Sequence, residues 1–331
     1  MRLENILALT NGELVNNPFV KNFENIVFDI KRLKRGDLFV AFDEEMIEEA
    51  VLSGAYGVIF DKPTQITDTE IAWIKVNCCE DALKRLLRFR LIEKDITVYK
   101  SNEIIVKLAL QVMTDSSFMV VHGDIKSLYK QLWNLEDKAT LLFCPSMSDA
   151  DIFTDVKELR VSQVEPITIM EQTLFETSFI YDNTFYERQL ISPFFMPYLE
   201  ELLHLYKSLK INYRLRKFTS IEHFEAVFVS KNLEVKEFGR SDKVLIFEPN
   251  SDLIALEIAF LQKNASWANS LYLIPESIDI LNNENVFVYK NINQALEILK
   301  TNKFHFALVA GVDQKILTRP ISNQTQLTLE F

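Results

Sequence analysis

Short apolar runs alternate with amphipathic segments along the first half of the chain. Apolar runs of strand length stand at 38–42, 57–61, 96–99, 118–121, 141–144 and 166–170. Segments with apolar residues at helical spacing lie before and between these runs, at 3–10, 44–53, 80–90, 102–113 and 124–133. Strands that alternate with helices of this length predict parallel sheets joined by crossover helices.

The second half begins with a different pattern and then returns to the first one. The same criteria predict hairpins at 178–190 and 224–238, helices at 198–209, 251–262 and 291–300, and strands at 243–247, 270–274, 285–289 and 306–310. The changes of pattern divide the chain into three predicted domains, 1–92, 93–213 and 214–331.

The charge balance limits the classes of partner. The formal net charge is −11, from 36 Lys and Arg against 47 Asp and Glu. A negative surface repels nucleic acid and anionic membranes, so we expect neither as a partner. Apolar runs stay well short of the ~18 residues of a membrane span, and the first residues lack a signal-peptide pattern. We therefore expect a cytoplasmic protein without membrane insertion.

The number and spacing of the cysteines, glycines and histidines exclude several kinds of functional site. Cys78, Cys79 and Cys144 form neither a CxxC motif nor a disulfide framework, so we expect free thiols, with a redox or metal role as the alternative. The 7 glycines include no G-x-G or G-x-x-x-x-G pair, which excludes an ordinary glycine-rich phosphate loop. The 4 histidines show no metal-ligand spacing. The sequence therefore indicates neither a catalytic residue nor a metal site.

Two polar segments are candidate anion or ligand sites. The first is the basic stretch 31–35, where Lys31, Arg32 and Arg35 can bind an anion or a partner, and where the alternative is a solvated turn. The second is the start of the helix predicted after 96–99, because N–H groups at a helix start favour anions. Its candidate residues are Lys100, Ser101, Asn102 and Lys107.

Residues 27–63 (VFDIKRLKRGDLFVAFDEEMIEEAVLSGAYGVIFDKP) resemble the N-terminal domain of the Mur ligases, most of all the MurF type, UDP-N-acetylmuramoyl-tripeptide:D-alanyl-D-alanine ligase. The family pattern there is Asp-Ser-Arg-x-Val-x-x-Gly-Asp-Leu-Phe-x-Ala, followed by a helix and Gly-Ala-x-x-Val-Val. The matching residues are Asp29, Gly36, Asp37, Leu38, Phe39, Ala41, Ala50, Gly54, Ala55 and Val58.

Later segments resemble the same family in the same order, although the chain is shorter than a working ligase, mainly in its central domain. The resemblance implies an α/β fold with a three-domain Mur-ligase-like architecture. Its parts would be an N-terminal-like domain, a reduced central parallel-sheet domain that is a degenerate ATPase, and a C-terminal Rossmann-like domain.

The chain departs from the family where active members bind ATP. Their central domain opens with Thr-Gly-x-Asn-Gly-Lys-Thr, and the collinear segment here is 99–105, YKSNEII. Ile104 replaces the phosphate-binding lysine, and Glu103 adds negative charge where phosphates would lie. The family's magnesium-binding glutamate and carbamylated lysine have no counterpart. Asn250 is the one candidate remnant of the adenine site. The UDP-sugar site is altered too, although Lys31 can still meet a phosphate.

These losses imply a catalytically inactive protein, a pseudoenzyme with a degenerate P-loop and a binding or regulatory role linked to bacterial peptidoglycan precursor synthesis. No cofactor is then expected, and the partner is a cell-wall synthesis enzyme or a UDP-linked muramyl precursor. The alternative is a divergent ATP-dependent MurF-like ligase that acts on UDP-linked muramyl peptides, and this alternative requires ATP and magnesium.

Overall fold

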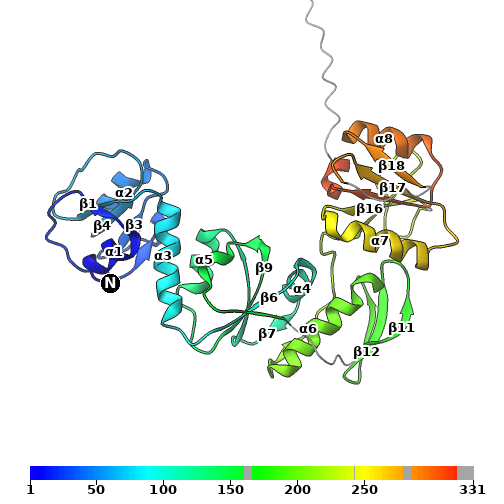
Figure 1. Ribbon diagram of the computed structural model, residues 1–331, viewed down its shortest axis with the longest axis horizontal. Helices are drawn as coiled ribbons and strands as arrows, with labels where there is room; N and C mark the ends of the chain where they lie inside the picture. The colour runs from blue at the N-terminus through cyan, green and yellow to red at the C-terminus, as the bar shows by residue number, and fades with distance from the viewer. Residues whose placement is uncertain (160–165, 242, 279–284, 319–331) are drawn as a thin grey trace, which may run out of the picture. The chain divides into compact units, whose positions relative to one another are not determined.

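The computed structural model describes residues 1–159, 166–241, 243–278 and 285–318, which form two compact α/β units (Figure 1). Unit 1 comprises Met1–Val106, Thr114–Arg160 and Leu209–Tyr213, and unit 2 comprises Lys107–Met113, Val161–Ser208 and Arg214–Phe331. The expected α/β class with parallel sheets is confirmed, and the division into three domains stays a prediction. Among the described residues, no helix combines the length and the apolar character needed to span a bilayer.

The first part of unit 1 is a five-stranded sheet with the order β1-β5-β4-β3-β2. Its strands are β1 (Glu13–Leu14), β2 (Ile26–Val27), β3 (Leu38–Val40), β4 (Gly57–Phe60) and β5 (Ala72–Lys75). Strands β2 to β5 run parallel, and β1 pairs with β5 in the antiparallel sense. The helices of this part are α1 (Leu3–Thr10), α2 (Met46–Leu52) and α3 (Cys79–Ile92).

Successive side chains of the central strands fill two separate cores. Leu38, Ile59 and Ile74 belong to the core that includes α1 and α3, whereas Phe39 and Trp73 belong to the core that includes α2. Because neighbouring side chains of a strand point to opposite faces, a sheet buried on both sides needs the continuous apolar runs seen in the sequence.

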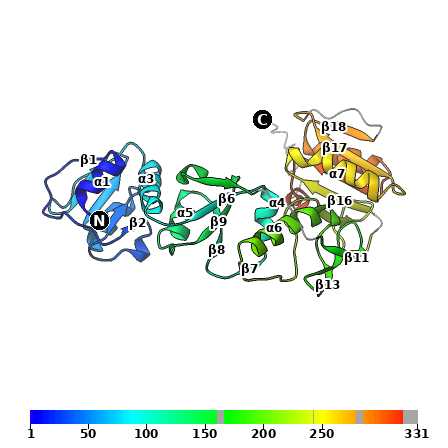
Figure 2. The same cartoon turned by 60° about the horizontal axis from the view of Figure 1, so that its bottom comes forward.

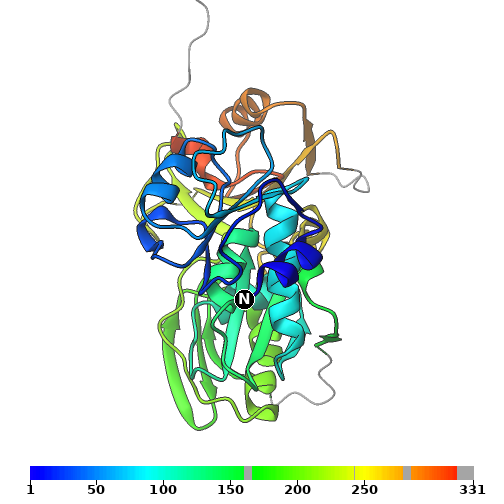
Figure 3. The same cartoon turned by 90° about the vertical axis from the view of Figure 1, so that its left-hand side faces the viewer.

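A second, all-parallel sheet completes unit 1, with the order β10-β6-β9-β8. Its strands are β6 (Thr97–Lys100), β8 (Phe118–Gly123), β9 (Thr140–Ser148) and β10 (Val156–Glu158), and its helices are α4 (Glu103–Ala109) and α5 (Ile125–Leu132). Helix α3 packs against both α1 and α5, so a single core runs from Leu3 to Ile152 (Figure 3). The two-residue strands β7 (Met113–Thr114) and β14 (Tyr213–Arg214) stand where the chain passes between the units.

Unit 2 begins with a three-stranded antiparallel sheet and the helix α6 (Met196–Ser208). Its strands are β11 (Thr168–Gln172), β12 (Thr177–Tyr181) and β13 (Thr184–Gln189). The run at 166–170 was predicted as a parallel strand, and this prediction is wrong. The hydroxyl of Thr173 accepts hydrogen bonds from the amides of Phe175 and Glu176, which fixes a turn that sends the chain back antiparallel.

The C-terminal sheet of unit 2 has the order β15-β16-β19-β17-β18 (Figure 2). Its strands are β15 (Glu225–Val229), β16 (Lys243–Glu248), β17 (Ser270–Pro275), β18 (Val286–Tyr289) and β19 (Phe306–Ala310), with helices α7 (Ser251–Asn264) and α8 (Ile292–Thr301). The hairpin predicted between 224–230 and 233–238 forms only in part: the chain turns back and makes one antiparallel bridge, while β15 pairs along its whole length with β16. Leu233 has a φ of 63°, which turns the chain, and 233–238 contributes only the bridge between Val229 and Val235.

Candidate functional site

The segment that resembles a nucleotide-binding loop is a short turn between β6 and α4. The amide of Ser101 donates to the carbonyl of Phe143 at 2.9 Å, which continues the sheet ladder. The amide of Ile105 donates to the side-chain oxygen of Asn102 at 2.9 Å, so this candidate residue caps the helix. Lys100 is exposed and Ser101 is half-buried. Two of the amides of this segment, those of Ser101 and Ile105, therefore bond within the fold.

The helix that follows this turn is anchored by apolar residues. Ile104, at the position that resembles the family's phosphate-binding lysine, is 2% exposed, and Ile105 is fully buried. A buried isoleucine supplies no positive charge, and Glu103 places a carboxylate in the first turn of α4. Neither Glu103 nor Ile104 therefore supplies the positive charge that the triphosphate of ATP needs.

Unit 1 contains a cavity of about 200 Å³, here called the basic cavity, lined by side chains of the 25–37 segment and of 129–134. Arg32, Lys34 and Lys130 line it. Of the three candidates predicted in the 31–35 stretch, Lys31, Arg32 and Arg35, only Arg32 lines this cavity, where Asp29 forms a 3.9 Å ion pair with it. Lys31 and Arg35 are exposed and are not among the lining residues.

A buried carboxylate organises one wall of the basic cavity. Asp37 is 1% exposed and accepts hydrogen bonds from the amide of Lys34 at 2.9 Å and from the side-chain nitrogen of Asn25 at 3.0 Å. The preceding Gly36 has a φ of +101°, a conformation that L side chains rarely adopt. The Gly-Asp pair of the resemblance thus has a physical role, since it turns the basic stretch back toward β3.

Aromatic rings also line the basic cavity. Tyr129 and Trp133 stack with ring centroids 4.5 Å apart, and Phe28 meets Tyr129 edge to face at 5.6 Å. The ammonium of Lys130 lies 5.3 Å from the centre of the Phe28 ring. Such a cavity can bind a ligand that has both an anionic group, which the cations would meet, and a flat or apolar group, which would pack against the aromatic rings.

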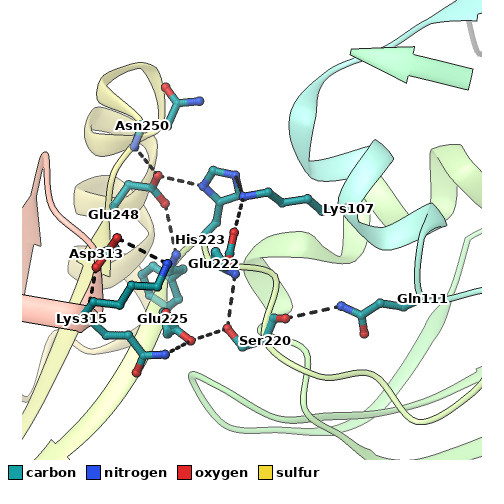
Figure 4. Close-up of polar contacts among 12 residues, drawn as sticks. Lys107, Gln111, Ser220, Glu222, His223, Glu225, Glu248, Asn250, Asp313 and Lys315 are labelled. Carbon is teal, nitrogen blue, oxygen red and sulfur yellow. Dashed lines mark hydrogen bonds and ion pairs between the residues drawn. The ribbon is translucent and has the colours of Figure 1, made fainter. Parts of the chain in front are cut away.

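Unit 2 holds a second cluster, here called the His223 network, which consists of Lys107, His223, Glu248, Asn250 and Glu257. Figure 4 shows Lys107 extending toward the ring of His223, with its Nζ 3.3 Å from His223 Nε2. On the other side of the ring, His223 Nδ1 lies 2.8 Å from Glu248 Oε1, which also accepts a 2.7 Å hydrogen bond from the amide of Asn250. Two predicted candidates, Lys107 and Asn250, are therefore brought into one network.

The charges of the His223 network are distributed unequally between its two glutamates. Burial raises the pKa of the Glu248 carboxyl, but the hydrogen bond from His223 and the further contacts around it lower this pKa by more, so it lies below its usual value. Burial, followed by the adjacent Glu248, raises the pKa of Glu257 to about 11. Glu257 is therefore protonated at neutral pH while Glu248 is ionised, an arrangement that can hold or pass a proton.

The position of this network follows from the sheet. Glu248 ends β16, at the carboxyl edge where open α/β sheets bind ligands, and Asn250 begins α7, where its side-chain oxygen accepts the amide of Asp252 at 3.0 Å. Sequence reasoning did not single out His223, Glu248 or Glu257. The available signals were a glutamate that closes an otherwise apolar strand and a glutamate on the apolar side of the 251–262 helix.

The cysteines and the side chains that could bind a metal do not form a further site among the described residues. Cys78 is half-buried, Cys79 and Cys144 are buried, and all three are free thiols. Burial, followed by the charge of Asp61, raises the pKa of the Cys79 thiol to about 12, so this thiol stays protonated. Across the residues that the structure describes, no group of three or more His, Cys, Asp and Glu side chains is placed to hold a metal ion.

Comparison with known proteins gives no sequence match and several structural ones. No protein-family model matches the chain, and no curated protein matches it. MurF from Acinetobacter baumannii (crystal structure I) aligns with a TM-score of 0.50 and 11% identity, over 93% of this chain and 95% of that one.

Two further solved structures align at slightly lower scores. UDP-N-acetylmuramoylalanyl-D-glutamyl-2,6-diaminopimelate–D-alanyl-D-alanyl ligase from Acinetobacter baumannii gives 0.48 at 11% identity, over 96% of this chain and 97% of that one. MurF ligase from Thermotoga maritima, in complex with ADP, gives 0.49 at 11% identity, over 88% and 95%. The chain has a Mur ligase-like α/β fold that extends over nearly its whole length.

Proposed function

We propose that the chain is a catalytically inactive Mur ligase-like protein, with a binding or regulatory role linked to peptidoglycan precursor synthesis. The observation that carries the proposal is the buried Ile104 at the position that resembles the family's phosphate-binding lysine. The capping of α4 by Asn102 supports it, because a capped helix start has fewer amides to offer a phosphate. A cytoplasmic location, without nucleic acid as a partner, accords with this role.

The proposed binding role rests on the basic cavity. One structural neighbour is named for ligation of a UDP-N-acetylmuramoyl peptide, and a ligand of this class combines phosphates with a flat base. Arg32 and Lys130 can meet the phosphates, and the rings of Phe28 and Trp133 can pack against a base. The cavity, at about 200 Å³, suits one part of such a ligand, since whole small-molecule sites usually measure roughly 300–1,000 Å³.

The alternative function is a divergent ATP-dependent ligase acting on UDP-linked muramyl peptides, with ATP and magnesium as cofactors. The observation that favours it is the His223 network, which joins Lys107 to Glu248 at the carboxyl edge of the C-terminal sheet. A cation, an imidazole and two carboxyl groups of different protonation could serve acid–base chemistry there.

The experiment that separates the two functions is a ligation assay with UDP-N-acetylmuramoyl-tripeptide, D-alanyl-D-alanine and Mg-ATP. Our proposal predicts no phosphate release and no ligated peptide above the rate without protein. The alternative predicts turnover that requires both substrates and that Lys107→Ala lowers by at least about tenfold. Lys300→Ala serves as the matched control, since Lys300 is exposed and lies on α8, outside both the network and the turn between β6 and α4.

A further inference from the structure

Unit 2 contains a cavity of about 540 Å³, here called the aromatic cavity, that neither the basic cavity nor the His223 network accounts for. It lies at the amino edge of the C-terminal sheet, where Val244 and Phe306 stand near the starts of β16 and β19. Glu248 and Asn250 lie at the other end of β16 and beyond it. The aromatic cavity is therefore separate from the carboxyl edge, at which open α/β sheets usually bind ligands.

Aromatic rings from separate segments form the walls of this cavity. Phe175, from the turn between β11 and β12, lies 6.3 Å from Phe228 and 6.2 Å from Phe306, between ring centroids. Phe260 of α7 also lines it, and Trp267 meets Phe306 edge to face at 6.0 Å. Edge-to-face packing holds each ring in place, so the apolar walls are formed before a ligand arrives.

Among the described residues that line the aromatic cavity, none carries a formal charge. Its polar members, among the described residues, are Gln172, Thr173, Ser241, Asn264 and His305. The amide of Asn269 donates to His305 Nδ1 at 3.0 Å, so the hydrogen of the neutral imidazole sits on Nε2. His305 therefore offers a hydrogen-bond donor at a lining without charged groups, which disfavours an ionised ligand because its charge would lose water without compensation.

Trp267 provides an independent sign of a ligand. Its side chain is 73% exposed, and its ring lies 5.8 Å from that of His305 at the same cavity. A large indole left in water next to a concave apolar surface is typical of binding sites, because a ligand that covers it removes apolar area from water. The volume falls in the range of roughly 300–1,000 Å³ seen for small-molecule sites.

We propose that the aromatic cavity binds a small, uncharged, planar aromatic molecule that carries a hydrogen-bond acceptor. The rings of Phe260, Phe306 and Trp267 pack against the faces and edges of this molecule. His305 Nε2 donates to its acceptor, which sets its orientation. This binding does not depend on the proposed function, since the cavity shares no residue with the basic cavity or the His223 network.

The test uses quinoline as the probe and the full chain labelled with fluorotryptophan. The chain has 3 tryptophans, of which Trp73 and Trp133 lie outside the aromatic cavity, and Trp267→Phe assigns the third resonance. At about pH 8 quinoline is uncharged, and we expect it to shift the Trp267 resonance saturably while the other two stay in place. A quinoline carboxylate is expected to bind at least about tenfold more weakly, because the cavity would have to strip water from its charge.

Three variants sharpen this test. Phe260→Ala should weaken quinoline binding by at least about tenfold, and the circular dichroism spectrum and thermal unfolding of the variant report whether unit 2, which contains Phe260, stays folded. His305→Ala removes an exposed ring together with the hydrogen bond that it accepts from the amide of Asn269, and it should weaken the binding of quinoline but not that of naphthalene, which lacks the acceptor. Phe185→Ala is the control, since Phe185 is exposed and lies on β13 outside the cavity.

The proposal is overturned if quinoline up to about 10 mM leaves the Trp267 resonance unmoved. Equal shifts of all three resonances, or equal affinity for the carboxylate, also overturn it.

Discussion

Glu257 shows how one buried carboxyl sets the chemistry of its surroundings. It lies on α7, is fully buried, and stands next to the carboxylate of Glu248. Burial and the adjacent Glu248 make its ionised form unfavourable, which raises its pKa to about 11. In the unfolded chain the same group ionises at its ordinary pKa. At neutral pH the carboxyl group is therefore protonated in the folded protein and loses its proton when the protein unfolds.

This linkage predicts a pH-dependent gain in stability for Glu257→Gln. The folded state binds one more proton than the unfolded state between the ordinary pKa and about 11, so the free energy of unfolding of the wild type falls as pH rises through this window. Glutamine keeps the shape and removes the titration. We expect the free energy of unfolding of the variant to exceed that of the wild type by about 1–3 kcal/mol at about pH 8, and by a smaller amount at about pH 6.

Urea unfolding at several pH values measures this difference. Glu297→Gln on α8 is the matched control, because Glu297 is exposed and should show no such pH dependence. A gain for Glu257→Gln that is constant with pH, or that shrinks as pH rises, would contradict the assigned protonation state.

The cysteines give a second prediction at the scale of single residues. Cys79 is buried, its Sγ donates to the carbonyl of Ala41, and its pKa is raised to about 12, so its thiolate is scarce. Cys144 is buried as well, whereas Cys78 is half-buried. We expect one thiol to react quickly with a thiol reagent in the native protein and the other two to react at least about tenfold more slowly. Cys78→Ser should remove the fast reaction, and a fast reaction that persists in this variant would show that a buried thiol is accessible.

At the scale of elements, the sequence predicted most of the α/β framework and missed specific pairings. The parallel strands of unit 1 were readable because their apolar runs are continuous and separated by helical patterns. The partner of β15 was not readable, because strand pairing depends on side chains distant in sequence, and β16 offers a longer apolar ladder than 233–238. The His223 network was hidden for the same reason, since its groups come from α4, the loop before β15, β16 and α7.

The basic cavity leads to a prediction about the residues that bind a ligand in it. If Arg32 and Lys130 hold phosphates of a UDP-linked muramyl peptide, Arg32→Ala and Lys130→Ala should each weaken its binding by about five- to tenfold, because each removes a charge-assisted contact. Lys31→Ala and Arg35→Ala change the same net charge at exposed positions outside the cavity and should leave the affinity within about twofold. Calorimetric titration with UDP-N-acetylmuramoyl-tripeptide measures the affinities. Equal losses in all four variants would instead indicate a diffuse electrostatic effect of the whole basic stretch.

At the scale of the whole molecule, a Mur ligase-like fold extends along the chain, while α4 begins with the carboxylate of Glu103 and the buried side chain of Ile104. Each unit retains concave or polar features of its own: the basic cavity in unit 1, and the His223 network and aromatic cavity in unit 2. These features, together with the buried Ile104, support the binding role that we propose.

The measurement that tests this account most directly is calorimetric titration of the full chain with Mg-ATP. The account predicts no saturable binding, measured as heat, at nucleotide concentrations up to the millimolar range. The reasons are that Ile104 supplies no positive charge and that the amide of Ile105 already donates its hydrogen bond to the side chain of Asn102. Saturable binding of Mg-ATP that is weakened by Lys100→Ala would contradict it, since that result would place the phosphates at the turn between β6 and α4.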